Sequence, residues 1–491
     1  MVQDAAVHLD VAIIGAGISG IGSARQLKAC CPWARFLVLE ALDEPGGTWV
    51  TNTYPGIRSD SDLYTFGYRF KPWTSAPIAT GAQICRYIHE VIKDEVLEGH
   101  IRYRHRLLKA MWSTRSRCWF LSVRAGASAE LLQFRADFLW MCQGYFRHSE
   151  GYVPDWPGRS DFKGPIIHPQ VWPKDAPLKN NRVVVVGSGA TAATLVPNIA
   201  DVCSQVTLIQ RSPTFFISGK NANELADTLR SLEIDERWIH EIVRRKILKD
   251  QEAFIRRCRD QPDLVRDELI GPVRECLGSD IADKHFTPRY RPWRQRIAVV
   301  PDGDLFTAIK SGRVVIKTAE IDRITAQGVR ITSGEVIDAD VIIAATGFNL
   351  CVMGDVGFTV DETPINFADT VTYRGVMFTG VPNLAYVFGY LRASWTLRVE
   401  LVADFVCKLL SHMRRTGASQ VEVALAAEEE RLPKGPWIDP EDFNPGYLRR
   451  SQHLLPKALS VHPWRHSQDY ATDRKQFPII DFTGREFRYK A

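Results

Sequence analysis

The chain has 491 residues, of which 45% are hydrophobic and 24% charged, and 62 basic against 57 acidic residues leave a formal net charge of +5. This length and composition indicate a globular protein of two or three domains and exclude a disordered or fibrous chain. So small a net charge lacks the strong basic excess of nucleic-acid-binding proteins, so we expect no nucleic-acid partner. The sequence carries no signal for the oligomeric state.

Targeting and metal-binding signals are missing from the sequence. The N-terminal stretch MVQDAAVHLD contains acidic residues instead of the apolar run of a signal peptide. No apolar run approaches the roughly 18 residues that suggest a transmembrane segment. Ten cysteines are scattered along the chain, only Cys30 and Cys31 are adjacent, and none has metal-ligand spacing. We therefore expect reduced thiols, no metal site, no transmembrane segment and a cytoplasmic location.

Strand and helix patterns alternate in two parts of the chain. The stretch LDVAIIGAGISGIGSARQL (9–27) is an apolar strand that leads through glycines into a helix, and a second strand follows at 36–40. The same order returns in RVVVVGSGATAATLVPNIA (182–200) and VTLIQRS (206–212). Alternating units of this kind build parallel sheets. The sequence therefore predicts an α/β protein with two Rossmann-like dinucleotide-binding domains.

The first glycine loop has the GxGxxG pattern, with Gly15, Gly17 and Gly20 at the glycine positions. The first glycine permits a tight turn, the second lets the backbone approach a pyrophosphate, and the third lets the helix pack against the strand. The acidic residue that ends the next strand, Glu40, stands about 20 residues further on, where a carboxylate takes the ribose hydroxyls. This loop is therefore predicted to bind a dinucleotide.

A glycine doublet follows this acid in the stretch GGTW, which contains Gly46, Gly47, Thr48 and Trp49. The doublet resembles the second FAD fingerprint of flavoproteins that hold two dinucleotides. The resemblance implies that these four residues hold backbone against FAD, which is the first expected cofactor.

The second glycine loop, GSGATA (187–192), repeats the pattern with alanine at the third position, which the fingerprint tolerates. Gly187, Gly189, Ala190 and Thr191 are its expected cofactor-binding residues. The following strand ends in Arg211 and Ser212 rather than in an acid.

An acid at the end of this strand would accept the 2′-hydroxyl of NADH and repel a 2′-phosphate. Arg211 instead offers a permanently charged fork that fits a phosphate, so we expect NADPH at this loop.

The expected domains follow from the two loops. Residues 1–150 form the first part of the FAD-binding domain, 151–340 the NADPH-binding domain, and 341–491 the second part of the FAD-binding domain with the C-terminal region. Between about 221 and 290, Leu, Arg, Glu and Asp recur at helical spacing, which predicts a helical insertion in the NADPH-binding domain.

The stretch between the loops, FKGPIIHPQVWP (162–173), fits the pattern FxGxxxHxxxW(P or D) through Phe162, Gly164, His168, Trp172 and Pro173. This pattern is the fingerprint of type I Baeyer–Villiger monooxygenases, which are class B flavoprotein monooxygenases. The sister flavin-containing and N-hydroxylating enzymes usually carry Tyr or Phe where Trp172 stands. In the family this linker couples domain rotation to cofactor movement, and its histidine has a structural role.

The resemblance continues through GGTW, YPGIRSDSD, GSGATA, LIQRSPT, VPDGDLF and ASWTL. These stretches are similar above all to the mycobacterial FAD monooxygenases that activate the prodrug ethionamide. The resemblance implies that NADPH reduces FAD, that O₂ adds at the flavin C4a, and that the resulting peroxyflavin anion attacks a ketone. The products are esters or lactones, and sulfoxidation of sulfides is a further expected activity.

The resemblance also supplies the catalytic residues. Arg296 matches the arginine that stabilises the oxyanions, and Asp60 matches the acid that orients it beside the flavin. Thr346 and Gly347 match the ATG motif at which the chain re-enters the FAD-binding domain. Family members commonly have a lysine before this arginine, which contacts the 2′-phosphate, whereas this chain has Gln295. The NADPH preference then depends more on Arg211 and Ser212.

Three other functions fit the sequence less well than ketone oxidation. The main alternative is a flavin-dependent N- or S-oxygenase of amines, thioethers or thioamides. A flavin disulfide reductase would need a redox-active cysteine pair beside the flavin, and the sequence has none. A non-catalytic nucleotide sensor is disfavoured because it would not need two complete cofactor sites. The segment 381–395, which includes Asn383 and Trp395, is expected to line the flavin and substrate side.

Overall fold

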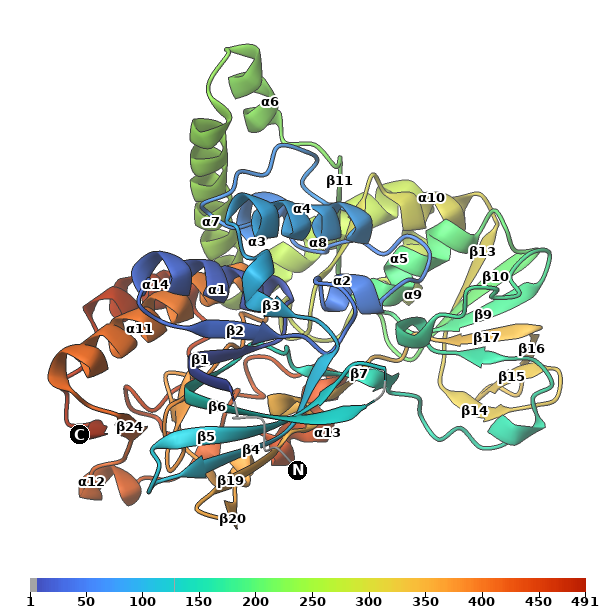
Figure 1. The fold of residues 1–491 in the computed structure, drawn as a ribbon. Helices are drawn as coiled ribbons and strands as arrows, with labels where there is room; N and C mark the ends of the chain where they lie inside the picture. Colours follow the sequence, from blue (N-terminus) through green and yellow to red (C-terminus); the bar gives the residue numbers. More distant parts are fainter. Residues whose placement is uncertain (1–6, 128) are drawn as a thin grey trace.

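The computed structural model of the chain describes residues 7–127 and 129–491. Two main β-sheets lie side by side, with helices packed against them and a group of helices projecting away from both (Figure 1). The first sheet contains, in spatial order, β20 (Thr363–Pro364), β19 (Gly357–Val360), β4 (His105–Ser113), β5 (Cys118–Ala125), β6 (Glu130–Met141), β1 (Val7–Ile14), β2 (Phe36–Leu39) and β3 (Ile101–Arg102), with β23 (Leu384–Tyr386) paired to β6.

The parallel part of the first sheet is buried on both faces. Strand β1 pairs in parallel with β2 and with β6, and its residues Val11–Ile14 have almost no exposed surface. Continuous apolar runs of this kind are typical of parallel strands whose two faces are both covered. Helix α1 (Ile18–Cys30) packs on this region together with α11 (Trp395–Thr416), a long helix from the C-terminal part of the chain. Helix α11 buries Leu397, Phe405 and Leu409.

The second sheet is parallel throughout, which confirms the expected α/β class. Its spatial order is β13 (Val314–Thr318), β10 (Gln205–Gln210), β9 (Arg182–Val186), β17 (Val341–Ala344) and β8 (Ile166–Ile167). The expected domain boundary at 340/341 falls before β17, yet β17 pairs with β9 in this sheet. The crossover back to the first sheet therefore begins after Ala344, because the apolar run from Val341 first completes the parallel sheet.

Two chain segments connect the sheets. These are β7 (Phe146–Gly151) and β18 (Phe348–Leu350), which pair with each other in an antiparallel ribbon. The linker at 162–173 lies against this ribbon through His168. Its Nε2 donates to the carbonyl oxygen of Gly347 at 3.0 Å, and its Nδ1 accepts from the backbone N–H of Gln170 at 3.1 Å. Burial lowers the pKa of His168, so the ring is neutral and connects the linker to the crossover.

The other linker residues contribute packing. A Cβ on Gly164 would lie 2.1 Å from the carbonyl oxygen of Asp340, so only glycine fits at this position. Phe162 and Trp172 pack against two different hydrophobic clusters. Two residues after His168, the Nε2 of Gln170 donates to the carbonyl oxygen of Arg147 at 2.5 Å. The linker is thus attached on one side to the second sheet and on the other to the crossover ribbon.

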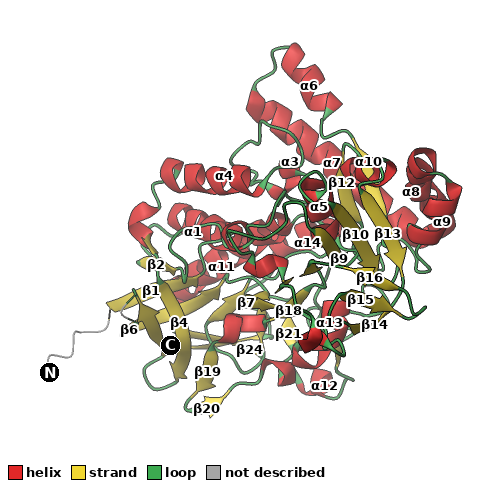
Figure 2. Cartoon of the chain, turned by 90° about the vertical axis from the view of Figure 1, so that its right-hand side faces the viewer, coloured by secondary structure: helices red, strands yellow, loops and turns green. Residues whose placement is uncertain are grey.

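The predicted helical insertion consists of α6 (Glu224–Ser231), α7 (Glu236–Asp260), α8 (Pro262–Leu277) and α9 (Ser279–His285). Helices α6 and α7 rise above the rest of the molecule (Figures 1 and 2). Helix α8 contacts α10 (Asp304–Lys310) beside the second sheet, whereas α7 contacts α3 (Leu63–Phe66) beside the first. The insertion therefore bridges both halves of the protein instead of packing on the second sheet alone.

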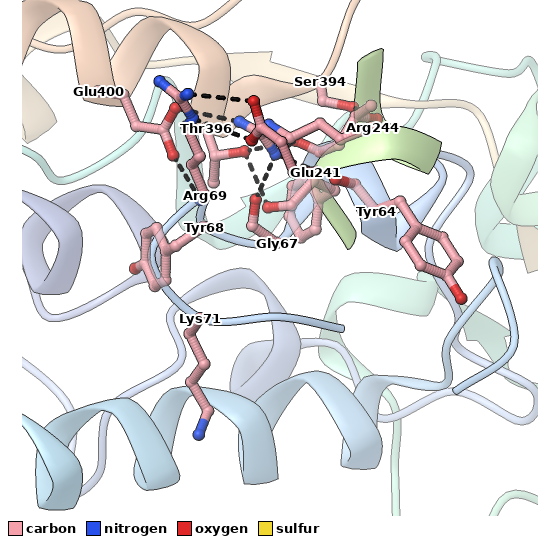
Figure 3. A network of polar contacts seen from close by, with 12 residues as sticks. Tyr64, Gly67, Tyr68, Arg69, Lys71, Glu241, Arg244, Ser394, Thr396 and Glu400 are labelled. Carbon is pink, nitrogen blue, oxygen red and sulfur yellow. Dashed lines mark hydrogen bonds and ion pairs between the residues drawn. The ribbon is translucent and has the colours of Figure 1, made fainter. Parts of the chain in front are cut away.

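One buried arginine of α7 attaches this helix to α3 and α11, which pack beside the first sheet. The Arg244 side chain is 4% exposed, and its Nη1 donates to the carbonyl oxygens of Tyr64, Thr65 and Gly67 at 3.0, 3.1 and 2.9 Å. Its Nη2 donates to a carboxylate oxygen of Glu400 at 3.0 Å. Figure 3 shows the guanidinium between the end of α3 and the glutamate on α11. These bonds satisfy carbonyls that the end of a helix leaves unpaired.

Across the described ranges, 7–127 and 129–491, no helix is both long and apolar enough to cross a membrane. Over the same residues, no group of three or more His, Cys, Asp or Glu side chains is arranged to hold a metal ion. All ten cysteines are free thiols.

We predict that Arg244→Met destabilises the protein by about 3–5 kcal/mol, because it leaves the Glu400 carboxylate and three carbonyls without their buried partner. Thermal or urea unfolding measures this loss. Arg245→Met is the matched control, since the neighbouring Arg245 side chain is 72% exposed and its ion pair with Glu241 is worth at most about 1 kcal/mol. Equal unfolding midpoints for the two variants would contradict the anchoring role.

Candidate active site

A cavity of about 1000 Å³ lies where the two glycine loops meet, at the carboxyl ends of the parallel strands of both sheets. Ligands of open α/β sheets bind at this edge. From the first half of the chain, the cavity is lined by the predicted residues Gly15, Gly17, Glu40, Gly46, Gly47, Thr48, Trp49 and Asp60. From the second half it is lined by Gly187, Gly189, Ala190, Thr191, Arg211, Ser212, Arg296, Thr346 and Gly347.

The first loop has the backbone geometry that its glycines predict. Gly15 has a φ of 99°, in the region that favours glycine, and a Cβ on it would lie 3.0 Å from the carbonyl oxygen of Cys142. Gly20 does not line the cavity, and a Cβ there would lie 1.8 Å from the carbonyl oxygen of Gly15. Its contribution is close packing of α1 on the loop. The backbone N–H groups at the start of α1 are left facing the cavity, which suits a pyrophosphate.

The glycine doublet packs directly on this loop. Gly46 donates its N–H to the carbonyl oxygen of Ala16 at 3.1 Å, and both Gly46 and Gly47 have positive φ values, 133° and 54°. A Cβ on Gly47 would lie 3.4 Å from the Cα of Gly17, at the cavity wall. The two backbones thus meet without side chains between them, which leaves the cavity wall open to a flat ligand.

The carboxylate of Glu40 holds the first loop in place. One of its oxygens accepts from the N–H of Ala16 at 2.6 Å and the other from the N–H of Leu42 at 2.8 Å. Burial raises the pKa of Glu40, and these backbone hydrogen bonds lower it in part. Each carboxylate oxygen can accept more than one hydrogen bond, so the residue can still accept from ribose hydroxyls.

The second loop repeats this construction. Gly187 has a φ of 147°, and a Cβ there would lie 2.2 Å from the carbonyl oxygen of Ala345. Helix α5 (Ala190–Ile199) begins directly after Gly189 and presents its N-terminal N–H groups at the cavity. Arg211 follows β10, is exposed at the cavity wall, and forms no ion pair with any carboxylate of the described residues. The second loop therefore offers both a pyrophosphate site and a free cation.

Arg296 and Asp60 form a bidentate ion pair in the cavity. The Nε–Oδ2 distance is 2.6 Å and the Nη2–Oδ1 distance is 2.7 Å, while Nη1 donates to the carbonyl oxygen of Leu391 at 2.9 Å. The two side chains are 34% and 28% exposed, through the cavity. Burial lowers the pKa of Arg296, but the charge and hydrogen bonds of Asp60 outweigh it and raise the pKa above the ordinary value. The guanidinium is therefore a permanent cation.

Two tyrosines that the sequence did not single out for this site flank the pair. Tyr145 and Tyr447 line the cavity, and their ring centroids are 6.3 Å apart. Burial raises the pKa of Tyr145, and it raises that of Tyr447 to about 12 against the opposing charge of Arg296. Both hydroxyls are thus protonated at neutral pH and can donate hydrogen bonds. Trp395 stacks on Tyr145 at 5.1 Å and lines the cavity as expected.

The expectation that Asn383 lines the same side is wrong. Its side chain is buried beside the first sheet, where Nδ2 donates to the carbonyl oxygens of Asp137 and Ser419 at 2.8 and 2.9 Å. Its Oδ1 accepts from the N–H of Val421 at 2.7 Å. Asn383 has a φ of 47°, and its amide satisfies backbone groups around a turn beside β23.

Comparisons with known proteins show which family the chain resembles. Residues 13–73 match the model of an NAD(P)-binding Rossmann-like domain, and residues 81–229 match that of the flavin-binding monooxygenase-like family. The FAD-containing monooxygenase EthA of Mycobacterium tuberculosis is 42% identical over 470 residues, which cover 95% of this chain and 94% of the relative. The probable FAD-binding monooxygenase AlmA of Acinetobacter baylyi is 37% identical over 476 residues, covering 95% and 93%.

The chain therefore belongs to the family of FAD-containing monooxygenases. The membership expected from its sequence motifs, including the similarity to the mycobacterial members, is confirmed.

Solved structures show the same fold. A crystal structure of OTEMO in complex with FAD and NADP matches with a TM-score of 0.76 at 20% identity, covering 99% of this chain and 100% of that one. An open crystal structure of cyclohexanone monooxygenase matches with the same TM-score at 18% identity, again covering 99% and 100%. At such identities the likeness establishes the fold, and it confirms the predicted pair of Rossmann-like units.

We predict that Gly20→Ala lowers the amount of FAD that co-purifies with the protein, because its Cβ forces α1 away from the first loop. Overpacking of this kind costs about 1–3 kcal/mol or more. The ratio of flavin to protein absorbance measures the effect. Gly99→Ala is the control, since a Cβ there meets no atom within 4 Å. A Gly20→Ala protein with the full flavin content of the control would contradict the packing argument.

Proposed function

We propose that this protein is an NADPH- and O₂-dependent monooxygenase that converts ketones to esters or lactones, with FAD on the first glycine loop and NADPH on the second. The observation that carries the proposal is the Arg296–Asp60 ion pair, which lies in the cavity that both loops line. Relatives whose names identify them as FAD-containing monooxygenases support it.

The residues of both loops fit the two cofactors. On the first loop, Gly15, Gly46 and Gly47 have positive φ values, and a Cβ on any of them would press against neighbouring protein atoms, so the loop and the doublet pack closely at the cavity wall. Glu40 is placed to accept from a ribose. On the second, Arg211 pairs with no carboxylate among the residues that the structure describes, and it suits the 2′-phosphate that distinguishes NADPH from NADH. We infer that FAD occupies the first site and NADPH the second.

Reduced FAD supplies the electrons that activate O₂, and the protein supplies the electrostatics. Inserting an oxygen atom beside a ketone carbonyl places negative charge on oxygen as the bond to carbon forms. A fixed cation in a site that excludes water stabilises such charge more than solvent does. Arg296 cannot lose its proton there, and Asp60 holds its Nε and one Nη, which leaves N–H groups beyond those used by Asp60 and Leu391 for a ligand in the cavity.

Asp60 also moderates the charge of Arg296. A single buried guanidinium would be costly to desolvate and would repel other cations, whereas the bidentate pair is nearly neutral when seen from a distance. The carbonyl oxygen of Leu391 accepts from the remaining Nη and fixes the plane of the group. The guanidinium is therefore set in position before substrate arrives, so no reorganisation is needed during the reaction.

Oxygenation of sulfur or nitrogen is the second candidate function, and the two tyrosines favour it. Transfer of an electrophilic oxygen to a thioether, thioamide or amine requires a protonated oxygen donor instead of an anion. Tyr145 and Tyr447 keep their hydroxyl protons beside Arg296 because burial raises both pKa values. The same cavity thus contains a cation for the first reaction and hydroxyl donors for the second.

The thiols in the cavity argue against a disulfide reductase. Cys142 and Cys351 both line it, and burial raises the pKa of each to about 12. At neutral pH they are thiols, whereas exchange with a disulfide requires a thiolate.

We predict that Arg296→Ala lowers ester formation from a ketone by about 100-fold to 1000-fold, the cost of removing one preorganised charge-stabilising group. Reduction of bound FAD by NADPH under anaerobic conditions should continue, because hydride transfer does not require the stabilised oxygen anion. Product analysis and flavin absorbance measure the two steps. Arg294→Ala is the control, since that arginine pairs with Glu441 at the surface. Ester yield near that of the control would exclude Arg296 from this role.

The two candidate reactions respond differently to the same substitution. With a panel of small ketones and sulfides, we predict that Arg296→Ala lowers sulfoxide formation far less than ester formation, because oxygen transfer to sulfur does not require an oxygen anion. The ratio of the two products in one mixed-substrate assay gives the result independently of protein concentration. Equal loss of both products would contradict separate electrostatic requirements, and NADPH consumption unaffected by every ketone would contradict the ketone oxidation itself.

A further inference from the structure

The short helix α13 (Gly446–Ser451) contributes three residues to the cavity wall, Gly446, Tyr447 and Arg450. Tyr447 and Arg450 are three positions apart, so they lie on the same face of the helix. Tyr447 lies beside Arg296, whose charge acts on its pKa. Arg450 lines the same cavity as the second glycine loop, and no motif in the sequence singled it out.

Arg450 is held in a defined position. Its guanidinium carbon lies 3.5 Å from the ring centroid of Tyr152, and its Nη2 donates to the carbonyl oxygen of Phe348 at 3.2 Å. Tyr152 is itself fixed, because its carbonyl oxygen accepts from Oγ1 of Thr346 at 2.5 Å. One face of the Arg450 guanidinium thus stacks on Tyr152, and one of its N–H groups is bonded to Phe348. An arginine has five N–H donors, so others remain for a ligand in the cavity.

Arg450 and Arg211 form a pair of cations without a counter-ion. Within residues 7–127 and 129–491, no carboxylate forms an ion pair with either guanidinium, although Glu320 also lines the cavity. Both guanidinium groups line the same cavity, where partial burial and the positive charge of Arg211 lower the pKa of Arg450. An anion between them would remove this repulsion and accept from both.

We propose that Arg450 is, with Arg211, the second guanidinium of the site for the 2′-phosphate of NADPH. This inference rests on the proposed function. The pyrophosphate has its own donors in the N–H groups of the second loop, at the start of α5. Arg211 follows β10, at whose carboxyl end this fold binds the adenosine ribose, and Arg450 lines the same cavity. Gln295, the remaining neighbour from the Arg296 segment, is neutral and supplies no cation.

The proposal explains how a neutral Gln295 is compatible with NADPH binding. Two guanidinium groups on different segments, one after β10 and one on α13, can each form paired N–H···O contacts with one phosphate dianion. Because α13 also carries Tyr447, docking of the phosphate would fix both ends of the helix over the cavity. The position of Tyr447 beside Arg296 would then depend on whether the nucleotide is bound.

The test uses the FAD-loaded protein and two probes, 2′,5′-ADP and 5′-AMP, which differ by the 2′-phosphate. We predict that Arg450→Ala weakens binding of 2′,5′-ADP by about tenfold or more in titration calorimetry and changes binding of 5′-AMP by less than about twofold.

Arg449→Ala is the matched control, since that exposed neighbour on α13 does not line the cavity. Unchanged FAD content and unfolding midpoint show that each variant is folded. Arg450→Lys should restore part of the affinity, because it returns the charge without the fork.

The outcomes separate this inference from the proposed function. If the unaltered protein prefers 2′,5′-ADP and Arg211→Ala removes that preference while Arg450→Ala retains it, the inference about Arg450 is wrong and the NADPH assignment stands. Equal weakening of both probes by Arg450→Ala would also overturn the inference, since it would place the residue elsewhere on the nucleotide. If the unaltered protein shows no preference between the probes, both the NADPH assignment and the inference fail.

Discussion

The bidentate ion pair between Arg296 and Asp60 connects the two halves of the cavity on which the function depends. Asp60 belongs to the first half of the chain, and Arg296 follows the helical insertion of the second. Each charge would be costly to bury alone, and each removes that cost for the other. The pair therefore requires the two Rossmann-like units to meet in one arrangement, and it places a permanent cation between their cofactor sites.

The rest of the architecture maintains this arrangement. The ribbon of β7 and β18 crosses between the sheets, and the neutral ring of His168 attaches the fingerprint linker to it. On the opposite side, Arg244 attaches the insertion to the end of α3. Both attachments are made to backbone carbonyls, whose positions are set by the main chain and not by flexible side chains. The fold thus holds the halves together at several points around the cavity.

Most of the cofactor framework could be predicted from the sequence, because glycine loops, strand ends and helix starts are local patterns with local causes. Gly15, Gly46 and Gly187 have the positive φ values that their positions in the fingerprints require. The placement of Arg296 beside Asp60 was predicted only through family resemblance, because no pattern within the chain relates residues so far apart in sequence.

Other features could not be read from local patterns because tertiary contacts decide them. Tyr447 and Arg450 reach the cavity through a six-residue helix whose own sequence shows no cofactor motif. Asn383 carries a polar side chain near the expected site, yet backbone groups of the first half bind it instead. Strand β17 lies beyond the expected boundary but pairs with β9, so it extends the second sheet.

The central claim is that Arg296, oriented by Asp60, lies against the flavin where oxygen is activated. A crystal structure of the protein with FAD and NADP⁺ bound tests it most directly. The account predicts an Arg296 nitrogen within about 3.5 Å of the flavin or of the nicotinamide amide beside it, with both bonds to Asp60 retained. An Arg296 side chain that points away from both cofactors into solvent, with Asp60 unpaired, would contradict it.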